Sequence, residues 1–578
     1  MVRRILGALL AIFIVAGCNQ RSATQAPGGN PMPEKKPAEP AAAAETHAFV
    51  VDLADGQALE DVQRATVQVF GKFQSAERLF PAASANDDPE QLSRIFRVVV
   101  AGPGPDGGPW DDAYALRDAG KFRRVEPDEP LRLEPRVDAA AAAPLACANN
   151  AGAPPADHGW APRAIRLAEA RTLAPPTGGK TLGEGIRVCH PDTGWTQHVD
   201  LDDASIDKTH GLNLIDGNID TQDPLGYGGN PGHGTGTGSL IISAGEIKPG
   251  SGTLPPSDVV GVAPKATLVP IRAIKSVVQV FDSDVARAVN HATVARCDVI
   301  SMSLGGKAFF GLERAVKDAV RKGVVVVSAA GNCVGFVVAP ASYANSIAAA
   351  ATNVDNQPWK GSSKGSAVDI SAPGEDVWAA EAGPSPFDKV KHGDGTSYAT
   401  AEVAGAAALW LAFFHVGQTD TGISRHEKFL AALRASAHDP CTDAGAPAGC
   451  SWDKKKYGPG ILDLRKLLST PPGSSSAALA AEPRDDTLTI LARMFDRDVP
   501  AVRVAVARLL GNPPDLDRQL ENLGPELVDI ATRDPAAFRG LLGVAPTPEA
   551  LSQPPAAALS DVRARASRRL AAQIRPTP

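Results

Sequence analysis

The stretch Gly393-Asp-Gly-Thr-Ser-Tyr-Ala-Thr-Ala-Glu-Val-Ala-Gly405 runs directly into the apolar segment Ala-Ala-Ala-Leu-Trp-Leu-Ala-Phe-Phe414. The apolar segment is too long for a strand, so it predicts a buried helix. Ser397 then lies where a loop becomes a helix, beside free backbone N–H groups and the positive end of the helix dipole, which stabilise negative charge. A serine in this position is also a common helix N-cap, and this stretch alone does not decide between the two roles.

Two other polar residues lie next to apolar runs elsewhere in the chain. The stretch Gly185-Ile-Arg-Val-Cys-His-Pro-Asp-Thr-Gly194 places Asp192 after an apolar run, and Pro231-Gly-His-Gly-Thr-Gly-Thr-Gly238 places His233 before one. Together with Ser397, these stretches resemble the subtilisin-like serine proteases, whose motifs Asp-Thr-Gly, His-Gly-Thr and Gly-Thr-Ser occur in this order. The resemblance implies that Asp192 orients His233 and that His233 takes the proton of Ser397.

A fourth stretch, Gly323-Val-Val-Val-Val-Ser-Ala-Ala-Gly-Asn332, has the apolar run of a strand that is buried on both faces of a parallel sheet. It places Asn332 at the end of that strand; an asparagine in a tight turn after a glycine is the alternative. In the resembling family this asparagine and the backbone N–H of Ser397 donate to the oxyanion. The implied reaction is peptide-bond hydrolysis by an endopeptidase through an acyl-enzyme, and no organic cofactor is required.

Two weaker matches concern binding. Ser303-Leu304-Gly305 resembles the edge segment that binds the substrate backbone by pairing with an extended peptide. His198-Val-Asp-Leu201 resembles the family segment whose aspartate binds a structural calcium ion, so Asp200 is a candidate metal ligand; an acidic surface turn is the alternative. Zinc binding by the cysteines is not expected, because no two of them have CxxC-type spacing.

Three residues depart from the family pattern. Ala401 and Glu402 stand where a proline and a histidine usually follow the nucleophile, and Pro191 stands where an aliphatic residue usually precedes the aspartate. None of the three positions carries a catalytic group. A carboxylate in so apolar a helix needs a partner or water, so Glu402 puts the leaving-group side of the cleft in doubt.

Apolar runs alternate with helical patterns between residues 160 and 469, which predicts an α/β fold with a doubly wound, mostly parallel sheet. The expected strands are 186–189, 266–274, 298–304, 324–329, 346–352 and 368–370, with helices such as 283–294 and 312–321 between them. Active residues of such sheets lie at the carboxyl ends of the strands. Asp192, Asn332 and the loop after Leu304 all follow predicted strands.

Residues 1–18 resemble a bacterial lipoprotein signal. Arg3 and Arg4 precede an apolar run that is too short to span a bilayer, and small residues then precede Cys18, the implied site of lipidation. This implies an exported protein, anchored in the cell envelope at the outer membrane or in the periplasm. An ordinary signal peptide with an incidental cysteine is the alternative. Residues 19–45, rich in Pro and Ala, are expected to be a flexible linker.

Residues 46–135 show short strand and helix patterns that resemble the α+β propeptide of many subtilisin-like proteases, so the protein is expected to be a zymogen; an unrelated binding domain is the alternative. Residues 136–159 are a candidate linker and processing zone, since their Ala/Pro/Asn composition leaves the chain free to enter an active site. A cut there would leave the lipid on the N-terminal piece and release residues 160–469, the expected catalytic domain.

After a linker at 470–482, residues 483–578 form a C-terminal extension in which helical patterns are separated by Pro513, Pro514 and Pro525. The patterns cover 488–495, 499–510, 516–523 and 556–574. We expect a packing or partner-binding appendage, and the sequence does not identify its partner. Four arginines near its end are expected to form a solvated helix face: Arg563, Arg565, Arg568 and Arg569.

The whole chain of 578 residues is 43% apolar, enough for two to four domains, and its net charge of −7 gives no reason to expect a nucleic-acid partner. Apart from Cys18, six cysteines remain, an even number that is compatible with three disulfides in an exported protein. Cys441 and Cys450 bracket a Gly/Ala/Pro loop and are the first pair that we expect.

The competing function is that of a non-catalytic surface protein that keeps this fold to bind peptides. The full set of Asp192, His233, Asn332 and Ser397 argues against it, because a binding module has no need of a base aligned with a serine. A protein or peptide is the expected partner in either case.

Overall fold

The structure is a computed structural model. It describes residues 46–83, 87–101, 108–132, 154–226, 230–250, 252–254, 259–277, 279–280, 282–417, 423–443, 446, 450–473, 486–542 and 555–574. The predicted signal, Cys18 and the linker at 19–45 lie outside the described residues, as do most of the predicted linkers at 136–159 and 470–482. We call residues 46–132 the N-terminal region, 154–473 the central region, and 486–574 the C-terminal helices.

The central region is built on a seven-stranded sheet with the order β13-β12-β11-β10-β6-β8-β7, in which every neighbouring pair is parallel. This confirms the predicted α/β fold with a mostly parallel sheet. The strands are β6 (Arg187–Asp192), β7 (Leu212–Asn213), β8 (Thr267–Arg272), β10 (Val299–Met302), β11 (Val325–Ala329), β12 (Ile347–Thr352) and β13 (Ile370–Pro373).

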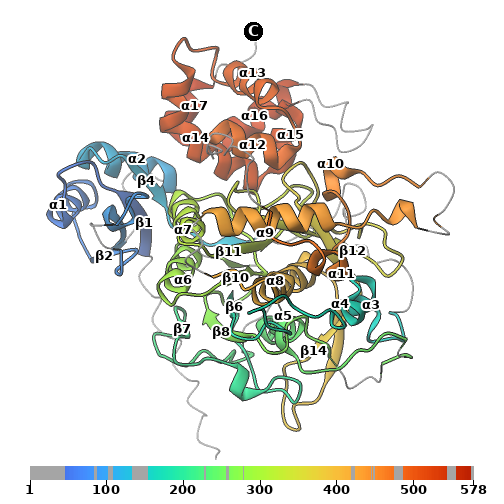
Figure 1. The fold of residues 1–578 in the computed structure, drawn as a ribbon. Helices are drawn as coiled ribbons and strands as arrows, with labels where there is room; N and C mark the ends of the chain where they lie inside the picture. The colour runs from blue at the N-terminus through green and yellow to red at the C-terminus, as the bar shows by residue number, and fades with distance from the viewer. Residues whose placement is uncertain are drawn as a thin grey trace, which may run out of the picture. The chain divides into compact units, whose positions relative to one another are not determined.

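Helices cover both faces of this sheet (Figure 1). Successive strand residues point to opposite faces, so Val325 and Val327 pack in one core while Val326 packs in the other. The first core includes α5 (His233–Ile242), α8 (Thr396–Phe413) and α9 (Ile423–Ser436). The second core includes α6 (Asp282–Val294) and α7 (Phe310–Arg321). Short helices complete the region: α3 (Trp160–Ala164), α4 (Leu167–Ala170), α10 (Lys454–Tyr457) and α11 (Leu464–Leu468).

The N-terminal region is a four-stranded antiparallel sheet, β2-β3-β1-β4, with two helices. Its elements are β1 (Thr46–Asp52), α1 (Leu59–Phe70), β2 (Ser75–Arg78), β3 (Ile95–Ala101), α2 (Pro109–Gly120) and β4 (Arg124–Pro127). Apolar residues of this region, such as Leu79 and Ile95, share a core with α6 and α7 of the central region. The two regions are therefore packed together.

Two small antiparallel pairs lie outside the main sheets. At the end of the N-terminal region, β5 (Leu131–Arg132) pairs with β9 (Gln279–Val280), which follows β8 and precedes α6 in the chain. The other pair is β14 (Val377–Ala380) with β15 (Val390–Gly393), just before α8. The chain that leaves the N-terminal region thus adds a strand to a segment of the central region.

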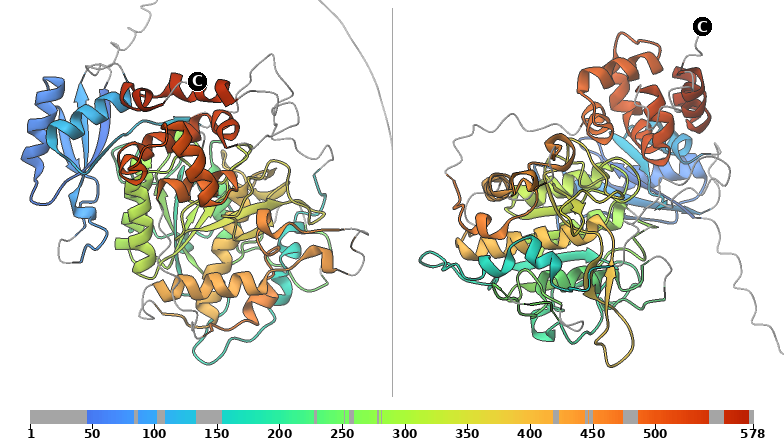
Figure 2. Two further views of the ribbon diagram at one scale, coloured as in Figure 1. Left: turned by 90° about the horizontal axis from the view of Figure 1, so that it is seen from above. Right: turned by 90° about the vertical axis from the view of Figure 1, so that its right-hand side faces the viewer.

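In the part of residues 486–574 that the structure describes, six helices pack around an apolar cluster that also includes Tyr114, Phe336 and Val338 (Figure 2). They are α12 (Thr487–Phe495), α13 (Val499–Leu509), α14 (Leu516–Arg533), α15 (Pro535–Leu541), α16 (Pro555–Arg565) and α17 (Arg568–Gln573).

Two predictions for the C-terminal helices were wrong. Helix α14 continues through Pro525, which was expected to end it. Proline removes one backbone hydrogen bond, but burial of Leu523 and Leu527 on either side holds the helix together. The expected helix at 556–574 is broken at Ser567, whose hydroxyl accepts from the Leu570 N–H as an N-cap.

Two disulfides are formed between described residues. One joins Cys441 to Cys450, the pair suggested by the sequence. The other joins Cys189 in β6 to Cys297 just before β10, and so links two neighbouring strands of the sheet. Cys333, directly after Asn332, is also disulfide-bonded.

Candidate active site

The four residues predicted to act together lie at the carboxyl ends of strands or the amino ends of helices. Asp192 is the last residue of β6 and Asn332 follows β11, while His233 begins α5 and Ser397 is the second residue of α8. This is the edge where open α/β sheets carry their sites. Ser397 thus lies in the first helical turn, where backbone N–H groups have no partner within the helix.

Asp192 and His233 form a close pair. His233 Nδ1 lies 2.8 Å from Asp192 Oδ1 and 3.0 Å from Oδ2. The Thr193 N–H also donates to Asp192 Oδ1, at 2.7 Å. Burial alone would raise the pKa of Asp192, but His233 and the other partners hold it below its ordinary value, so the carboxyl is ionised. An ionised partner on Nδ1 leaves Nε2 as the nitrogen that can accept a proton.

Two glycines in these motifs stand where a side chain would clash with neighbouring backbone. Gly194 has a φ of 111°, and a Cβ there would lie 2.5 Å from the Thr221 carbonyl oxygen. A Cβ on Gly234 would lie 2.0 Å from the Gly194 carbonyl oxygen. A side chain at Gly234 would push the Asp192 and His233 motifs apart, and one at Gly194 would displace the backbone near Thr221.

Ser397 points to the predicted substrate-binding segment. Its hydroxyl donates to the Ser303 carbonyl oxygen at 3.2 Å, and the Ser303 hydroxyl donates to the Ser397 carbonyl oxygen at 2.8 Å. Among the described residues, the Ser397 hydroxyl makes this hydrogen bond and none to His233. Catalytic hydrogen bonds are often absent or long before substrate binds.

Asn332 is held by the residue just before Ser397. The N–H and the hydroxyl of Thr396 both donate to Asn332 Oδ1, each at 2.9 Å. This fixes the side-chain amide and leaves Nδ2 as a donor on the side of Gly395, where a Cβ would lie 3.1 Å from Nδ2. The arrangement thus places an N–H donor next to the start of α8.

The sequence did not single out Thr237 and His190, which also contact the pair. Thr237 Oγ1 lies 3.0 Å from the His233 carbonyl oxygen, 3.4 Å from Asp192 Oδ2 and 2.9 Å from His190 Nε2. Burial lowers the pKa of His190, so it is neutral beside the carboxylate. Spacing could have found both, since His190 is two residues from Asp192 on a strand and Thr237 is four from His233 on a helix.

The remaining substrate-segment residues follow β10. Leu304 is buried, and a Cβ on Gly305 would lie 2.3 Å from Val338 Cγ2. The segment is thus packed tightly against the loop that follows Asn332.

The three departures from the family pattern are all buried. The β10–β6 ladder ends at the pair Ile300 and Cys189, before Pro191, which has no N–H to contribute. Ala401 packs in the first core of the central region. Glu402 is fully enclosed, its Oε2 accepts no hydrogen bond from any described residue, and burial raises its pKa well above the ordinary value.

The calcium expectation for Asp200 gains no support from its surroundings. Asp200 Oδ2 lies 3.5 Å from His198 Nδ1. Within the ranges that the structure describes, no group of three or more His, Cys, Asp or Glu side chains could hold a metal ion. Calcium is also bound by backbone and amide oxygens, so Asp200 stays a prediction, and we derive no step through a metal.

No helix in the described part of the chain is both long and apolar enough to cross a bilayer. The predicted lipidation site, Cys18, is not among these residues.

Comparisons with known proteins agree with the geometry. Residues 183–448 match the model of the subtilase family, peptidase S8. Subtilisin Savinase from Lederbergia lenta is 35% identical over 242 residues, which are 41% of this chain and 81% of Savinase. Thermitase from Thermoactinomyces vulgaris is 33% identical over 230 residues, 39% of this chain and 75% of thermitase. The chain belongs to the subtilase family and is a subtilisin-like serine endopeptidase.

Two further matches differ in how much of each protein they cover. An alkaline protease from Alkalihalobacillus alcalophilus is 35% identical over 41% of this chain, and the match spans little more than half, 57%, of that protein. A solved protease structure from Pseudoalteromonas arctica PAMC 21717 aligns with a TM-score of 0.43 and 23% identity, over 55% of this chain and 99% of that one.

Proposed function

We propose that this endopeptidase works through Asp192, His233 and Ser397, with Asn332 as an oxyanion donor, and that it is exported and anchored to the cell envelope. The observation that carries the first part is the close contact of the Asp192 carboxyl with His233 Nδ1, at 2.8 and 3.0 Å. This pair leaves Nε2 free to act as a base towards Ser397.

In the reaction, Ser397 Oγ leaves its hydrogen bond to Ser303 and attacks the scissile carbonyl carbon, while His233 Nε2 takes the hydroxyl proton. Asn332 Nδ2 and the Ser397 N–H stabilise the oxyanion. His233 then gives the proton to the leaving amine, and water hydrolyses the acyl-enzyme by the same route in reverse. Asp192 stabilises the imidazolium throughout.

The substrate is an extended peptide whose backbone pairs with Ser303, Leu304 and Gly305. The close contact of Ser303 with Ser397 supports this role, because a strand added at this segment would bring its carbonyl groups to the serine.

The N-terminal region acts as the propeptide. The pairing of β5 with β9 supports this role, because it shows the chain leaving that region adding a strand to the central region near the carboxyl edge of the sheet. Cleavage follows this segment, in residues 136–159. The envelope anchor is a lipid on Cys18, for which the signal-like sequence at 1–18 is the support.

A fluorophosphonate probe tests the function, because it bonds only to a serine activated as a nucleophile. We expect labelling of the wild type and none of Ser397→Ala, with the exposed Ser469→Ala as the control that keeps labelling. A wild type that stays unlabelled after removal of the N-terminal region would favour the peptide-binding protein instead.

A further inference from the structure

The C-terminal helices have a partner within the chain. Trp110 and Tyr114 are one helical turn apart on α2 of the N-terminal region, and both reach α14. Trp110 Nε1–H donates to Asp529 Oδ2 and the Tyr114 hydroxyl donates to Glu526 Oε2, each at 2.8 Å. Tyr114 is only 3% exposed and packs in the core of the C-terminal helices rather than in that of its own region.

The two acids of α14 are buried, so these hydrogen bonds are costly to lose. Glu526 is fully enclosed and accepts from Tyr114 and from the N–H and hydroxyl of Ser567, at 2.8, 2.6 and 2.9 Å. Removal of the N-terminal region would leave Glu526 Oε2 with Ser567 alone, and Asp529 Oδ2 without Trp110. A buried carboxylate that loses a donor pays the cost of its desolvation.

Charged pairs surround this aromatic contact. Arg569 of α17 pairs with Asp118 of α2, and the Arg568 N–H donates to Asp111 Oδ1 at 2.9 Å. Of the four arginines expected to form a solvated face, Arg563, Arg565 and Arg568 are exposed, while Arg568 and Arg569 also face acids of the N-terminal region. Exposed pairs contribute little stability each, but they fix which surface is bound and in which orientation.

Lys307 of the central region joins all three parts. Its ammonium donates to the Pro127 carbonyl oxygen at 3.1 Å and lies 3.8 Å from Asp529 Oδ1. Burial alone would lower the pKa of Lys307, but Asp529 and Asp282 hold it above its ordinary value, so it stays charged.

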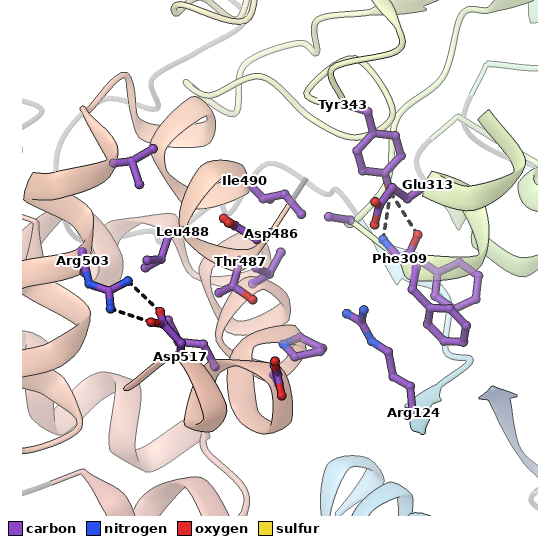
Figure 3. A pocket seen from close by; sticks show the side chains of 17 residues that line it. Arg124, Phe309, Glu313, Tyr343, Asp486, Thr487, Leu488, Ile490, Arg503 and Asp517 are labelled. Atoms are coloured by element: carbon purple, nitrogen blue, oxygen red, sulfur yellow. Dashed lines mark hydrogen bonds and ion pairs between the residues drawn. The ribbon is translucent and has the colours of Figure 1, made fainter. Parts of the chain in front are cut away.

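The C-terminal helices are also fixed to the central region without help from the N-terminal region. Arg539 donates to the carbonyl oxygens of Val334 and Gly335 at 3.2 and 2.8 Å, and Phe495 packs near Phe336. Where the three parts meet, a cavity of about 420 Å³ separates Arg124 and Phe309 from α12–α14 (Figure 3). The C-terminal helices contact the N-terminal region mainly at α2, and Arg533 also lies 3.7 Å from Glu129, which follows β4.

We propose that the C-terminal helices are a clamp that keeps the N-terminal region bound after the chain has been cut. The region also contacts the central region directly, for example through Arg314 and Asp52 at 2.7 Å, so release requires two surfaces to separate together. Cleavage alone would then leave the enzyme inhibited and attached to the lipid-bearing piece. The sequence had instead suggested that cleavage releases the catalytic domain. This inference rests on the proposed cleavage after Arg132.

The test measures how fast the cut piece leaves. A Ser397→Ala chain that lacks residues 1–18 receives a cleavage sequence for a site-specific protease at 139–143, ahead of Cys147, so that no disulfide ties the piece. Dissociation is followed by gel filtration after the cut. Trp110→Phe with Tyr114→Phe keeps the rings but removes both donors, and we expect dissociation to be about 100-fold faster, since each bond to a charged group accounts for about tenfold or more.

Two further variants distinguish loss of the clamp contact from misfolding of the chain. Arg568→Glu with Arg569→Glu reverses two charges at the rim of the contact and removes the Arg569 guanidinium from the Tyr114 ring, where it lies 4.9 Å from the ring centre. We expect faster, salt-dependent release, because the new carboxylates face Asp111 and Asp118. Arg123→Lys, in an exposed pair with Asp55 inside the N-terminal region, is the control that should not change the rate. Rates within twofold of the parent for both double variants would overturn the clamp. The chain is inactive and cut externally, so failure of self-processing in the wild type would count against the propeptide alone.

Discussion

His233 is held from one side in this structure. Asp192 fixes Nδ1, whereas the Ser397 hydroxyl, which Nε2 must reach, donates to Ser303. Rotation about the Cα–Cβ bond of Ser397 is the smallest movement that breaks this hydrogen bond. Because Ser303 belongs to the segment that is proposed to pair with substrate, binding of a peptide and alignment of the serine are coupled at one residue.

Glu402 gives a prediction for the pH dependence of stability. Its folded pKa is well above the unfolded value near 4.5, so the folded protein keeps a proton that the unfolded chain releases. The resulting stability is fully present below about pH 4.5 and is lost as pH rises towards the folded pKa, at about 1.4 kcal/mol per pH unit. We expect Glu402→Gln to remove this slope.

Denaturant unfolding at several pH values between 5 and 9 provides the measurement, with both chains carrying Ser397→Ala to prevent self-digestion. Only the slopes of the free energy of unfolding against pH are compared. A cost of burying the amide that does not depend on pH therefore leaves the comparison unchanged. Equal slopes for the parent chain and the Glu402→Gln chain would mean that the carboxyl has found a partner or water.

At the scale of elements, the two disulfides should differ in their contribution to stability. Cys441 and Cys450 are 9 residues apart, and Cys189 and Cys297 are 108 apart. Loop-closure entropy predicts a contribution of about 2–3 kcal/mol for the short loop and about 5 kcal/mol for the long one. Pairwise replacement of the cysteines by serine or alanine, followed by calorimetry, measures both. A larger loss for the short loop would contradict the entropic account.

The central strands could be predicted from the sequence because their residues are apolar on both faces. Val324–Ala329 was expected and β11 begins one residue later. The strand β2, Ser-Ala-Glu-Arg, could not be found, because it has no large apolar residue and is formed by pairing with β3. Local sequence likewise marks Pro525 as a helix end, whereas distant packing decides that α14 continues.

At the scale of the whole molecule, the motifs of the site could be recognised in the sequence, whereas the contacts between regions could not be predicted from it. Asp192, His233 and Ser397 each stand in a short motif with its own local signal. Trp110 and Tyr114 are separated from Glu526 by about 400 residues, and in sequence all three look like ordinary members of two amphipathic helices. Only the fold shows that the C-terminal helices bind the N-terminal region.

The central claim is that His233 and Ser397 act as one unit, and a double-variant comparison tests it most directly. The wild type, Ser397→Ala, His233→Ala and the double variant are each cut at an engineered site at 139–143 and freed of the N-terminal piece, so that all are compared on equal terms. The measurement is kcat for peptide-amide hydrolysis. We predict a loss of about 10⁶-fold for each single variant and no further loss for the double variant, the behaviour of residues that act as a unit. Hydrolysis by Ser397→Ala within tenfold of the wild type, or single losses that multiply in the double variant, would contradict the account.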